Sequence, residues 1–179
     1  APLGEAASGR KAKLRPLLAL WPYAARYRGH IVAAVAALTV ASLATLAVPV
    51  AVPEPKLMPG AASASADAYV RTLRGDLEHS GIFRVINPTA YISDPQSSGL
   101  TLESINFENW RTIGALGLAT GSLESTAEGI AVDARYFDIA NRSLVGGRRL
   151  VGGAGDAKRM GHRMADAILE FLTGIPGPF

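Results

Sequence analysis

The segment from residue 156 to residue 179 repeats its apolar residues at helical spacing, and this feature constrains the fold most. The apolar residues recur every four positions: Met160, Met164, Ile168 and Leu172. This spacing predicts a helix with one apolar stripe. Asp156 is placed to cap the first turn, and Gly174 is placed to end the helix. Such a stripe needs a sheet or another helix to cover it.

The residues before this helix are patterned to supply that sheet. Five short apolar segments are predicted as strands: residues 48–52, 82–86, 115–122, 130–137 and 144–151. In the fourth segment, one apolar set (Ile130, Val132, Ala134, Tyr136) alternates with a second set, which gives the strand two distinct faces. Asn141 and Arg142 fit a hairpin turn after that strand, because Asn tolerates left-handed geometry. Residues 56–64 and 93–104 are rich in turn-forming residues and are expected to be loops.

Two further helices are expected between the strands. The first begins with Ser65 as its cap, ends at Ser80, and has an apolar stripe made of Tyr69, Val70, Leu73 and Leu77. The second is a short helix over residues 106–113, capped by Asn106. Phe107 and Trp110 on this helix have two interpretations, packing in the core or anchoring a partner, and we favour the core.

The resulting fold class is α/β, with a mixed five-stranded sheet packed against two main helices on one sheet face. One N-terminal hydrophobic helix, a transmembrane or signal helix, is expected to precede this domain. Prolines interrupt the strand over residues 48–52, and proline cannot donate a hydrogen bond to a neighbouring strand. We therefore expect this strand at the edge of the sheet.

An uncharged run of 22 residues ends at Val52, long enough to span a hydrocarbon core of about 30 Å as a helix. Basic residues and the aromatic Trp21, Tyr23 and Tyr27 precede it, which orients the N-terminus to the cytoplasm and the rest across the membrane. We divide the chain into a basic, partly disordered cytoplasmic-side arm (1–29), a transmembrane or signal segment (30–52) and a folded domain (53–179). Three alternatives stay open for residues 30–52: a retained anchor, a cleaved export signal or a buried helix.

Composition excludes several classes of function. The chain has no cysteine, which rules out disulfides, thiolate catalysis and cysteine-ligated zinc. The net charge of +3 is modest and arises in the N-terminal arm, and no aromatic residues alternate with basic ones as in a nucleic-acid groove. We therefore expect no nucleic-acid partner.

No catalytic set can be assembled from the sequence. His30, His79 and His162 fall in unrelated elements without metal-ligand spacing, and no serine has the GxSxG context of a nucleophile elbow. The glycine-rich segment 152–158 opens the last helix. It is interpreted as a capping loop, with an anion site as the alternative. We expect no enzyme activity, no metal and no cofactor.

Residues 14–52 resemble the elbow and first transmembrane helix of ABC-exporter permeases, a pattern of low specificity. No further spanning helix follows, and no phosphate loop of the GxxxxGK[ST] kind occurs. This resemblance implies an alternative function, a fragment of an ABC-type transporter membrane subunit.

A second resemblance is more specific and covers about residues 48–179. Three separated motifs occur in the family's order: Phe107 with Trp110 and Arg111; Phe137, Asp138 and Ile139; and Leu172, Thr173 and Gly174. The segment from Asp76 to Tyr91 also resembles the family's first helix and second strand. These residues resemble the N-terminal domain of TolB, the periplasmic component of the Tol–Pal envelope system.

This resemblance implies a non-catalytic periplasmic domain that supports outer-membrane integrity and cell division by binding protein partners. The family's N-terminal tail is implicated in contacting TolA, and its C-terminal propeller docks Pal. An edge strand here would accept a partner strand by β-augmentation, so the expected partner-binding residues are Val48, Pro49, Val50, Ala51 and Val52. An uncleaved segment 30–52 would tether the domain to the inner membrane.

Overall fold

The computed structural model describes residues 47–179. The predictions for the arm at 1–29, and for the hydrophobic segment up to residue 46, lie outside the described residues. Between residues 47 and 179, the helices are all too short or too polar to cross a membrane.

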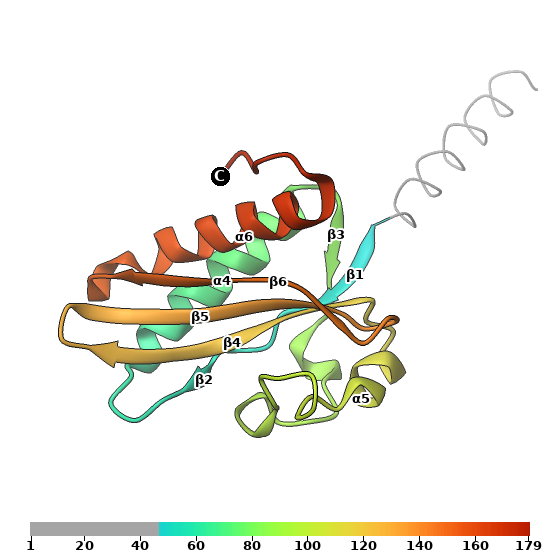
Figure 1. Ribbon diagram of the computed structural model, residues 1–179, viewed down its shortest axis with the longest axis horizontal. Helices are drawn as coiled ribbons and strands as arrows, with labels where there is room; N and C mark the ends of the chain where they lie inside the picture. Colours follow the sequence, from blue (N-terminus) through green and yellow to red (C-terminus); the bar gives the residue numbers. More distant parts are fainter. Residues whose placement is uncertain (1–46) are drawn as a thin grey trace, which may run out of the picture. The chain divides into compact units, whose positions relative to one another are not determined.

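A mixed sheet runs through the centre of the domain (Figure 1). Its strands are β1 (Val48–Ala51), β2 (Lys56–Leu57), β3 (Phe83–Val85), β4 (Gly117–Thr126), β5 (Gly129–Asp138) and β6 (Ser143–Gly152). The order is β3-β1-β4-β5-β6, with β2 pairing to β4. The pairs made by β1 and β2 are parallel, whereas β4, β5 and β6 pair antiparallel. The prediction of a mixed sheet is confirmed, but the sheet has a sixth strand, because β2 forms inside the stretch expected to be a loop.

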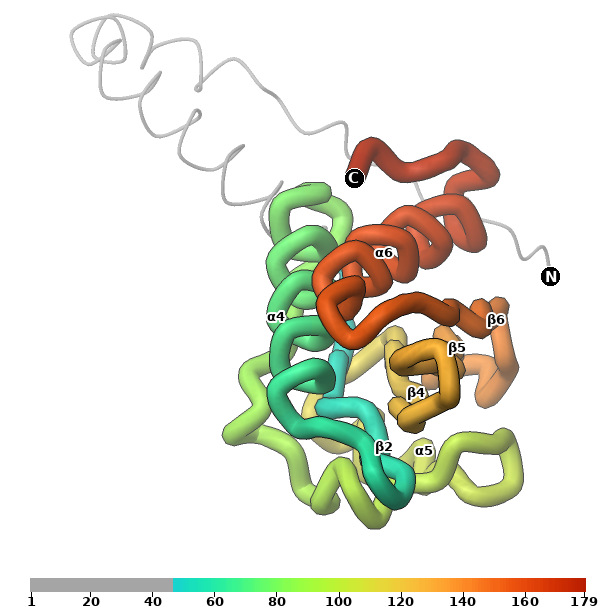
Figure 2. The backbone as a smooth tube through the Cα atoms, turned by 90° about the vertical axis from the view of Figure 1, so that its left-hand side faces the viewer, coloured from blue at the N-terminus to red at the C-terminus, as the bar shows by residue number. Residues whose placement is uncertain are grey.

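The helices lie on both sides of this sheet (Figures 1 and 2). They are α4 (Ser63–His79), α5 (Phe107–Thr112) and α6 (Ala157–Thr173), with three short 3-10 turns η1 (Pro88–Ala90), η2 (Pro95–Ser97) and η3 (Ala154–Asp156). The two long helices α4 and α6 cover one face together, as expected. The short helix α5 lies on the opposite face, where the sequence analysis placed no helix.

Alternate residues of the strands pack into two separate hydrophobic cores, one under α4 and α6 and the other under α5. On β5, the set from Ile130 to Tyr136 faces the core of α4 and α6, whereas Phe137 faces the core of α5. On β1, Val50 belongs to the first core and Ala51 to the second. The predicted two-faced character of the fourth expected strand is therefore confirmed, and it follows from the period of two that a strand imposes on its side chains.

The stripe predicted for α4 is buried: Tyr69, Val70, Leu73 and Leu77. The predicted cap is wrong, because α4 starts at Ser63 and its N-cap residue is Ala62, which makes no side-chain cap hydrogen bond. The carbonyl of Ala62 instead accepts from the backbone N–H of Ser65 at 3.1 Å. The helix thus begins two residues before the predicted cap.

In α6 the first three stripe residues are buried: Met160, Met164 and Ile168. Leu172 is 44% exposed, so its predicted core position is wrong, and Leu169 is buried instead. The reason is helical phase. Each step of four residues advances about 40° past a full turn, and three steps carry Leu172 off the stripe. Gly174 ends the helix with a left-handed backbone (φ 72°), as predicted.

The turn between β5 and β6 explains part of the Phe137–Asp138–Ile139 motif. The carboxylate of Asp138 accepts from the Asn141 backbone N–H at 2.8 Å and from its side-chain amide at 2.8 Å. Arg142, rather than Asn141, takes the left-handed backbone (φ 50°). The hairpin is confirmed, with Asn141 stabilising the turn through its side chain.

The prediction that residues 48–52 form an edge strand is wrong. β1 lies between β3 and β4 and pairs in parallel with both. Pro49 is tolerated because its backbone nitrogen, which has no hydrogen to donate, faces β4 where the pairing of the two strands starts. Its carbonyl accepts from the Leu116 N–H at 2.9 Å, and its missing N–H falls where β4 has not yet begun. The last residues of the predicted hydrophobic segment are therefore part of the folded domain.

Gly161 sets how closely α6 approaches α4. A Cβ there would lie 2.8 Å from the Tyr69 carbonyl oxygen and 2.8 Å from the Thr72 Cβ. Beside it, His162 Nδ1 lies 2.6 Å from a carboxylate oxygen of Asp76, which links the two helices at their surface. The helix pair that covers the sheet therefore depends on a residue without a side chain.

We predict that Val50→Asp lowers the free energy of unfolding by more than about 3 kcal/mol, because it buries an unpaired charge. Val50 is 0% exposed. The control is Val151→Asp on β6, at a side chain that is 49% exposed, which should cost less than about 1 kcal/mol. Urea denaturation measures both, and equal losses would contradict the buried position of β1.

We also predict opposite effects for two helical glycines. Gly161→Ala should destabilise the fold by about 1–3 kcal/mol through overlap with the α4 backbone. Gly75→Ala on α4, where a Cβ meets no atom within 4 Å, should stabilise it by about 0.5–1 kcal/mol. Thermal denaturation of the two variants tests this, and a stable Gly161→Ala variant would show that the helices are free to separate.

Candidate interaction surface

The end of the sheet where β1 starts carries an apolar pocket of about 230 Å³. We call it the Tyr136 pocket. It is lined by residues from β1, β5, β6, α6 and the segments next to them: Val48, Leu116, Tyr136, Asp138, Ala140, Val145 and Leu172. Its lining includes Val48, one of the residues that the sequence analysis assigned to partner binding.

Tyr136 forms part of this pocket with its ring buried and its hydroxyl next to Gly117, where any Cβ would overlap it. Burial raises the pKa of Tyr136 to about 12, and the nearby Asp138 carboxylate acts in the same direction. Within residues 47–179 this hydroxyl has no hydrogen-bond partner. The pocket therefore has two polar residues, Tyr136 and Asp138, among apolar ones.

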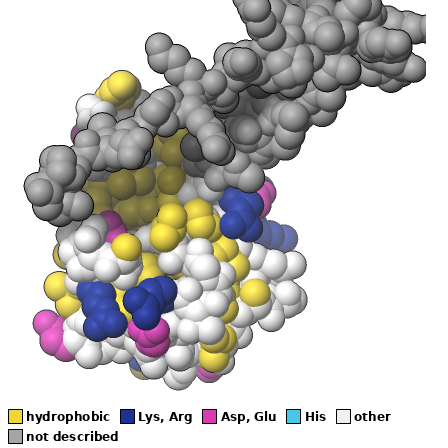
Figure 3. Space-filling view, turned by 90° about the vertical axis from the view of Figure 1, so that its right-hand side faces the viewer, with side chains coloured by type: hydrophobic (Ala, Val, Ile, Leu, Met, Phe, Trp, Pro, Cys, Tyr) yellow, Lys and Arg dark blue, Asp and Glu magenta, His cyan; other side chains and the backbone are white. Residues whose placement is uncertain are grey.

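Large apolar side chains are exposed around the pocket. Leu116 is 52% exposed and Leu172 is 44% exposed, and both line the pocket. Figure 3 shows the end of the domain that lies on the right of Figure 1, with apolar side chains gathered on it. Exposed apolar surface of this kind is typical of protein contacts.

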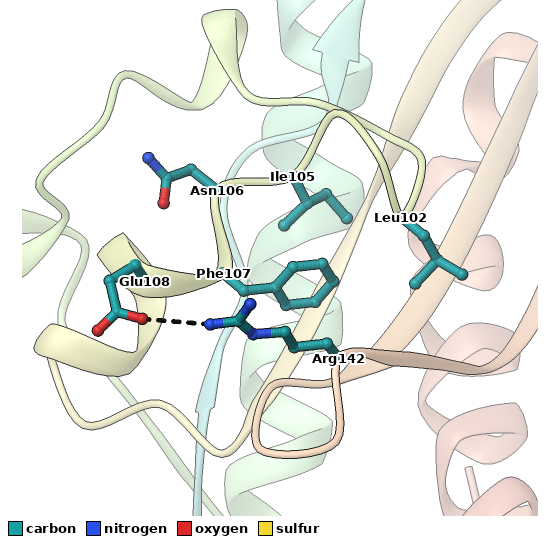
Figure 4. Close-up of a pocket in the computed structure, with 6 residues that line it drawn as sticks. All are labelled: Leu102, Ile105, Asn106, Phe107, Glu108 and Arg142. Carbon is teal, nitrogen blue, oxygen red and sulfur yellow. Dashed lines mark hydrogen bonds and ion pairs between the residues drawn. The ribbon is translucent and has the colours of Figure 1, made fainter.

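A second hollow of about 400 Å³, the Phe107 pocket, lies between α5 and the β5–β6 turn. Figure 4 shows Arg142 reaching from that turn across the Phe107 ring toward Glu108. Arg142 Nη2 lies 3.5 Å from one carboxylate oxygen of Glu108, and Arg111 Nη2 lies 2.7 Å from the other. All three side chains are more than half exposed, and such pairs contribute little to stability.

A third hollow of about 340 Å³, the Arg74 pocket, lies at the carboxyl ends of β1 and β3. The Arg74 guanidinium donates to the Val52 carbonyl at 2.9 and 2.7 Å. The Tyr91 hydroxyl accepts from the Val52 N–H at 3.1 Å and donates to the Ile86 carbonyl at 3.3 Å. Burial raises the pKa of Tyr91. Arg74 and Tyr91 therefore provide hydrogen-bond partners for the backbone of Val52, the residue after β1, and their role here is structural.

The structure separates the five predicted partner-binding residues. Val48 lines the Tyr136 pocket and Pro49 is partly buried, whereas Val50, Ala51 and Val52 are 0% exposed. The sequence analysis missed Leu116 and Leu172. Leu116 lies inside the strand predicted over residues 115–122, one position before the observed start of β4. Leu172 leaves the helical stripe by phase, a signal that was present in the sequence.

Other residues singled out from the sequence have structural roles. Phe107 is 8% exposed and Trp110 is 3% exposed, which confirms core packing over partner anchoring. Trp110 packs edge-to-face with Tyr91, with ring centroids 5.1 Å apart. The Asp156 carboxylate accepts from the Gly153 N–H at 2.9 Å, within the turn before α6. Asp156 is the N-cap residue of α6 but makes no side-chain hydrogen bond to that helix, so its predicted role as the cap of the first turn is wrong. In the part of the chain that the structure describes, no three histidine or acidic side chains are placed to hold a metal.

Comparison with known proteins gives a consistent result. The sequence model of the TolB amino-terminal domain matches residues 36–145. The Tol-Pal system protein TolB of Syntrophotalea carbinolica is 38% identical over 107 residues, which cover 60% of this chain and 25% of that protein. The Tol-Pal system protein TolB of Desulfosudis oleivorans is 33% identical over 138 residues, covering 74% of this chain and 31% of that protein. The chain thus spans under a third of the length of these relatives.

Among solved structures, the fold is similar to that of TolB from Acinetobacter baumannii, with a TM-score of 0.59 and 24% identity. The similarity covers 74% of this chain and 30% of that one. The resemblance of residues 14–52 to an exporter permease is not borne out. The matched sequence model begins at residue 36, inside that stretch, and β1 belongs to the sheet.

We predict that Tyr136→Phe changes the alkaline stability of the domain. Burial raises the pKa of Tyr136 in the folded protein to about 12, from the ordinary value of 10.0. The stability that this raised pKa contributes is complete below pH 10 and is lost as pH rises through about 12. The variant should therefore lose less stability over that range, as measured by urea midpoints at successive pH values.

Tyr91→Phe is the matched control at neutral pH. It removes a hydroxyl that serves the Val52 N–H and should cost about 1–3 kcal/mol at pH 7, whereas Tyr136→Phe should cost less than about 1 kcal/mol. A large loss in Tyr136→Phe at pH 7 would mean that its hydroxyl is bonded in solution.

Proposed function

The chain belongs to the family of TolB amino-terminal domains, and on that premise we propose that it is a periplasmic protein-interaction domain of the Tol–Pal system. The observation that supports this most is the match of the family's sequence model across residues 36–145. The family is a non-enzymatic component of that system, in agreement with the sequence analysis, which found no catalytic set. The similarity to the Acinetobacter baumannii structure supports the fold alone.

We propose that the domain supports outer-membrane integrity and cell division through partner proteins. TolA is the partner that the family resemblance indicates, and Pal would be a second partner wherever a propeller accompanies the domain. The predicted hydrophobic segment 30–52 lies outside the described residues up to residue 46, and its three alternatives stay predictions: a retained anchor, a cleaved export signal or a buried helix. The first two alternatives put the folded domain in the periplasm, and only the first tethers it to the inner membrane.

The proposed partner contact lies where the chain passes into β1. Val48 and Pro49 are the members of the predicted set that reach the surface, and the Tyr136 pocket lies beside Val48. Val50, Ala51 and Val52 act from the core, where they hold the first two residues in place. Since both edges of β1 are paired, this contact uses side chains of β1 and its neighbours rather than strand addition.

Calorimetric titration of the full chain with the C-terminal domain of TolA tests the proposal. We expect saturable binding by the parent chain and at least about tenfold weaker binding by Leu116→Asp, which places a charge in an apolar contact. Leu102→Asp, at a leucine that is 42% exposed in the Phe107 pocket, is the control and should bind like the parent. No binding by the folded parent chain would contradict the proposed partner, and equal effects of both variants would contradict the proposed contact.

A further inference from the structure

The two outer edges of the sheet differ in length and in exposure. β3 has three residues, whereas β6 has ten. Among residues 47–179, β6 pairs with β5 alone, and no other backbone segment bonds to its outer side. A long strand with one side unpaired presents a row of backbone donors and acceptors, and this row is a template for a further strand.

In β2, by contrast, a side chain occupies the backbone groups that no strand pairs with. The side-chain amide of Gln96 lies along β2, where it accepts from the Leu57 N–H at 3.0 Å and donates to the Pro55 carbonyl at 3.1 Å. This amide takes the place of a neighbouring strand. β1 is paired on both sides. The contrast leaves β6 as the long side that the described residues do not cover.

The charges of β6 are of one sign. From Asn141 to Gly155 the sequence contains three arginines and no acidic residue. Arg148 and Arg149 are consecutive, so their side chains project to opposite faces of the sheet. Arg148 lies over the Phe171 ring, 5.2 Å from its centroid, and pairs with Glu170 of α6 at 3.2 Å. On the other face, Arg149 pairs with Glu124 of β4.

These ion pairs leave the arginines accessible to a partner. The Arg148 side chain is 48% exposed and the Arg149 side chain is 55% exposed, and pairs in contact with water hold their geometry weakly. A carboxylate of a partner can therefore accept a hydrogen bond from either guanidinium while the existing ion pair stays in place, because a guanidinium has five N–H donors. Val151 is 49% exposed on the same face as Arg149, so an apolar residue of the incoming strand would be covered there.

The same charges disfavour a second copy of this chain as the occupant. Antiparallel pairing of β6 with itself would bring the arginines of both copies close together across the new ladder. Like charges on neighbouring strands are destabilising. An acidic strand has the opposite effect, since each of its carboxylates would meet an arginine.

We propose that β6 accepts an extended acidic segment of a partner protein as an additional strand of the sheet, with two consecutive carboxylates facing Arg148 and Arg149. The affinity comes from backbone hydrogen bonds along β6, and the selectivity comes from the two arginines. Of β6, the Tyr136 pocket includes Val145, whereas the two arginines lie outside its lining. The proposal does not depend on the assignment to the Tol–Pal system.

The test uses the full chain and a synthetic peptide of about ten residues, with alternating Thr and Val around a central Glu-Glu pair. We expect the peptide to bind and to slow hydrogen exchange of the β6 amides. A peptide with Lys-Lys at the centre should bind at least about tenfold more weakly. A Glu-Glu peptide N-methylated at alternate residues keeps its side chains but loses backbone donors, and it should also bind at least about tenfold more weakly.

Two protein variants provide the matched comparison. The double variant Arg148→Gln with Arg149→Gln should bind the Glu-Glu peptide at least about tenfold more weakly. Arg84→Gln changes an exposed arginine on the opposite edge strand, β3, and should bind like the parent chain. Circular dichroism establishes that each variant is folded before its affinity is compared.

Three outcomes would overturn the proposal. The first is no binding of the Glu-Glu peptide to the folded parent chain. The second is equal affinity for the N-methylated peptide, which would mean that side chains alone make the contact. The third is a stable dimer of the parent chain in sedimentation whose β6 amides are already protected from exchange, because a second copy would then occupy this edge.

Discussion

The pairing of β1 on both of its sides is the interaction on which the rest of the structure depends. This short strand joins β3 and the hairpin strands into one sheet, because no other strand among residues 47–179 pairs with both. The two cores also meet on it. Val50 packs under α4 and α6, Ala51 packs under α5, and the backbone of Val52 is held by Arg74 and Tyr91. A central strand that is this short leaves few alternative registers, since a shift of one residue would exchange the two faces.

The two candidate contact surfaces share one strand but use different parts of it. The Tyr136 pocket is lined by the first residue of β1 and by Val145 near the start of β6, whereas Arg148 and Arg149 lie further along β6, which β4 and β5 separate from β1. The first surface is mainly apolar, with Tyr136 and Asp138 as its polar residues, and depends on side chains. The second surface is a backbone edge with arginines on both faces. A domain with both surfaces has the means to engage two partners of different chemistry, which is in keeping with a non-catalytic role.

The sequence predicted local features well and neighbour relations poorly. The stripe of α4, the two faces of β5 and the C-cap at Gly174 all depend on residues within a few positions of one another. The wrong predictions concern residues that lie farther apart in the sequence. Leu172 failed because small phase errors accumulate over three helical turns. The loop prediction at Lys56 failed because β2 exists through its pairing with β4 and the amide of Gln96, and both lie far along the chain.

By itself, the sequence determined the fold class, most of the helix and strand positions and the family resemblance, because hydrophobic period and turn chemistry act over a few residues. Only the tertiary structure decided that Val48–Ala51 is central and that, within the described residues, β6 has no neighbour on its outer side. A proline in a strand shows that one N–H is missing, but it does not show on which side of the strand, or next to which neighbour, that gap falls. Strand order is set by contacts between residues distant in the chain, and it is this order that decides which backbone groups stay available to a partner.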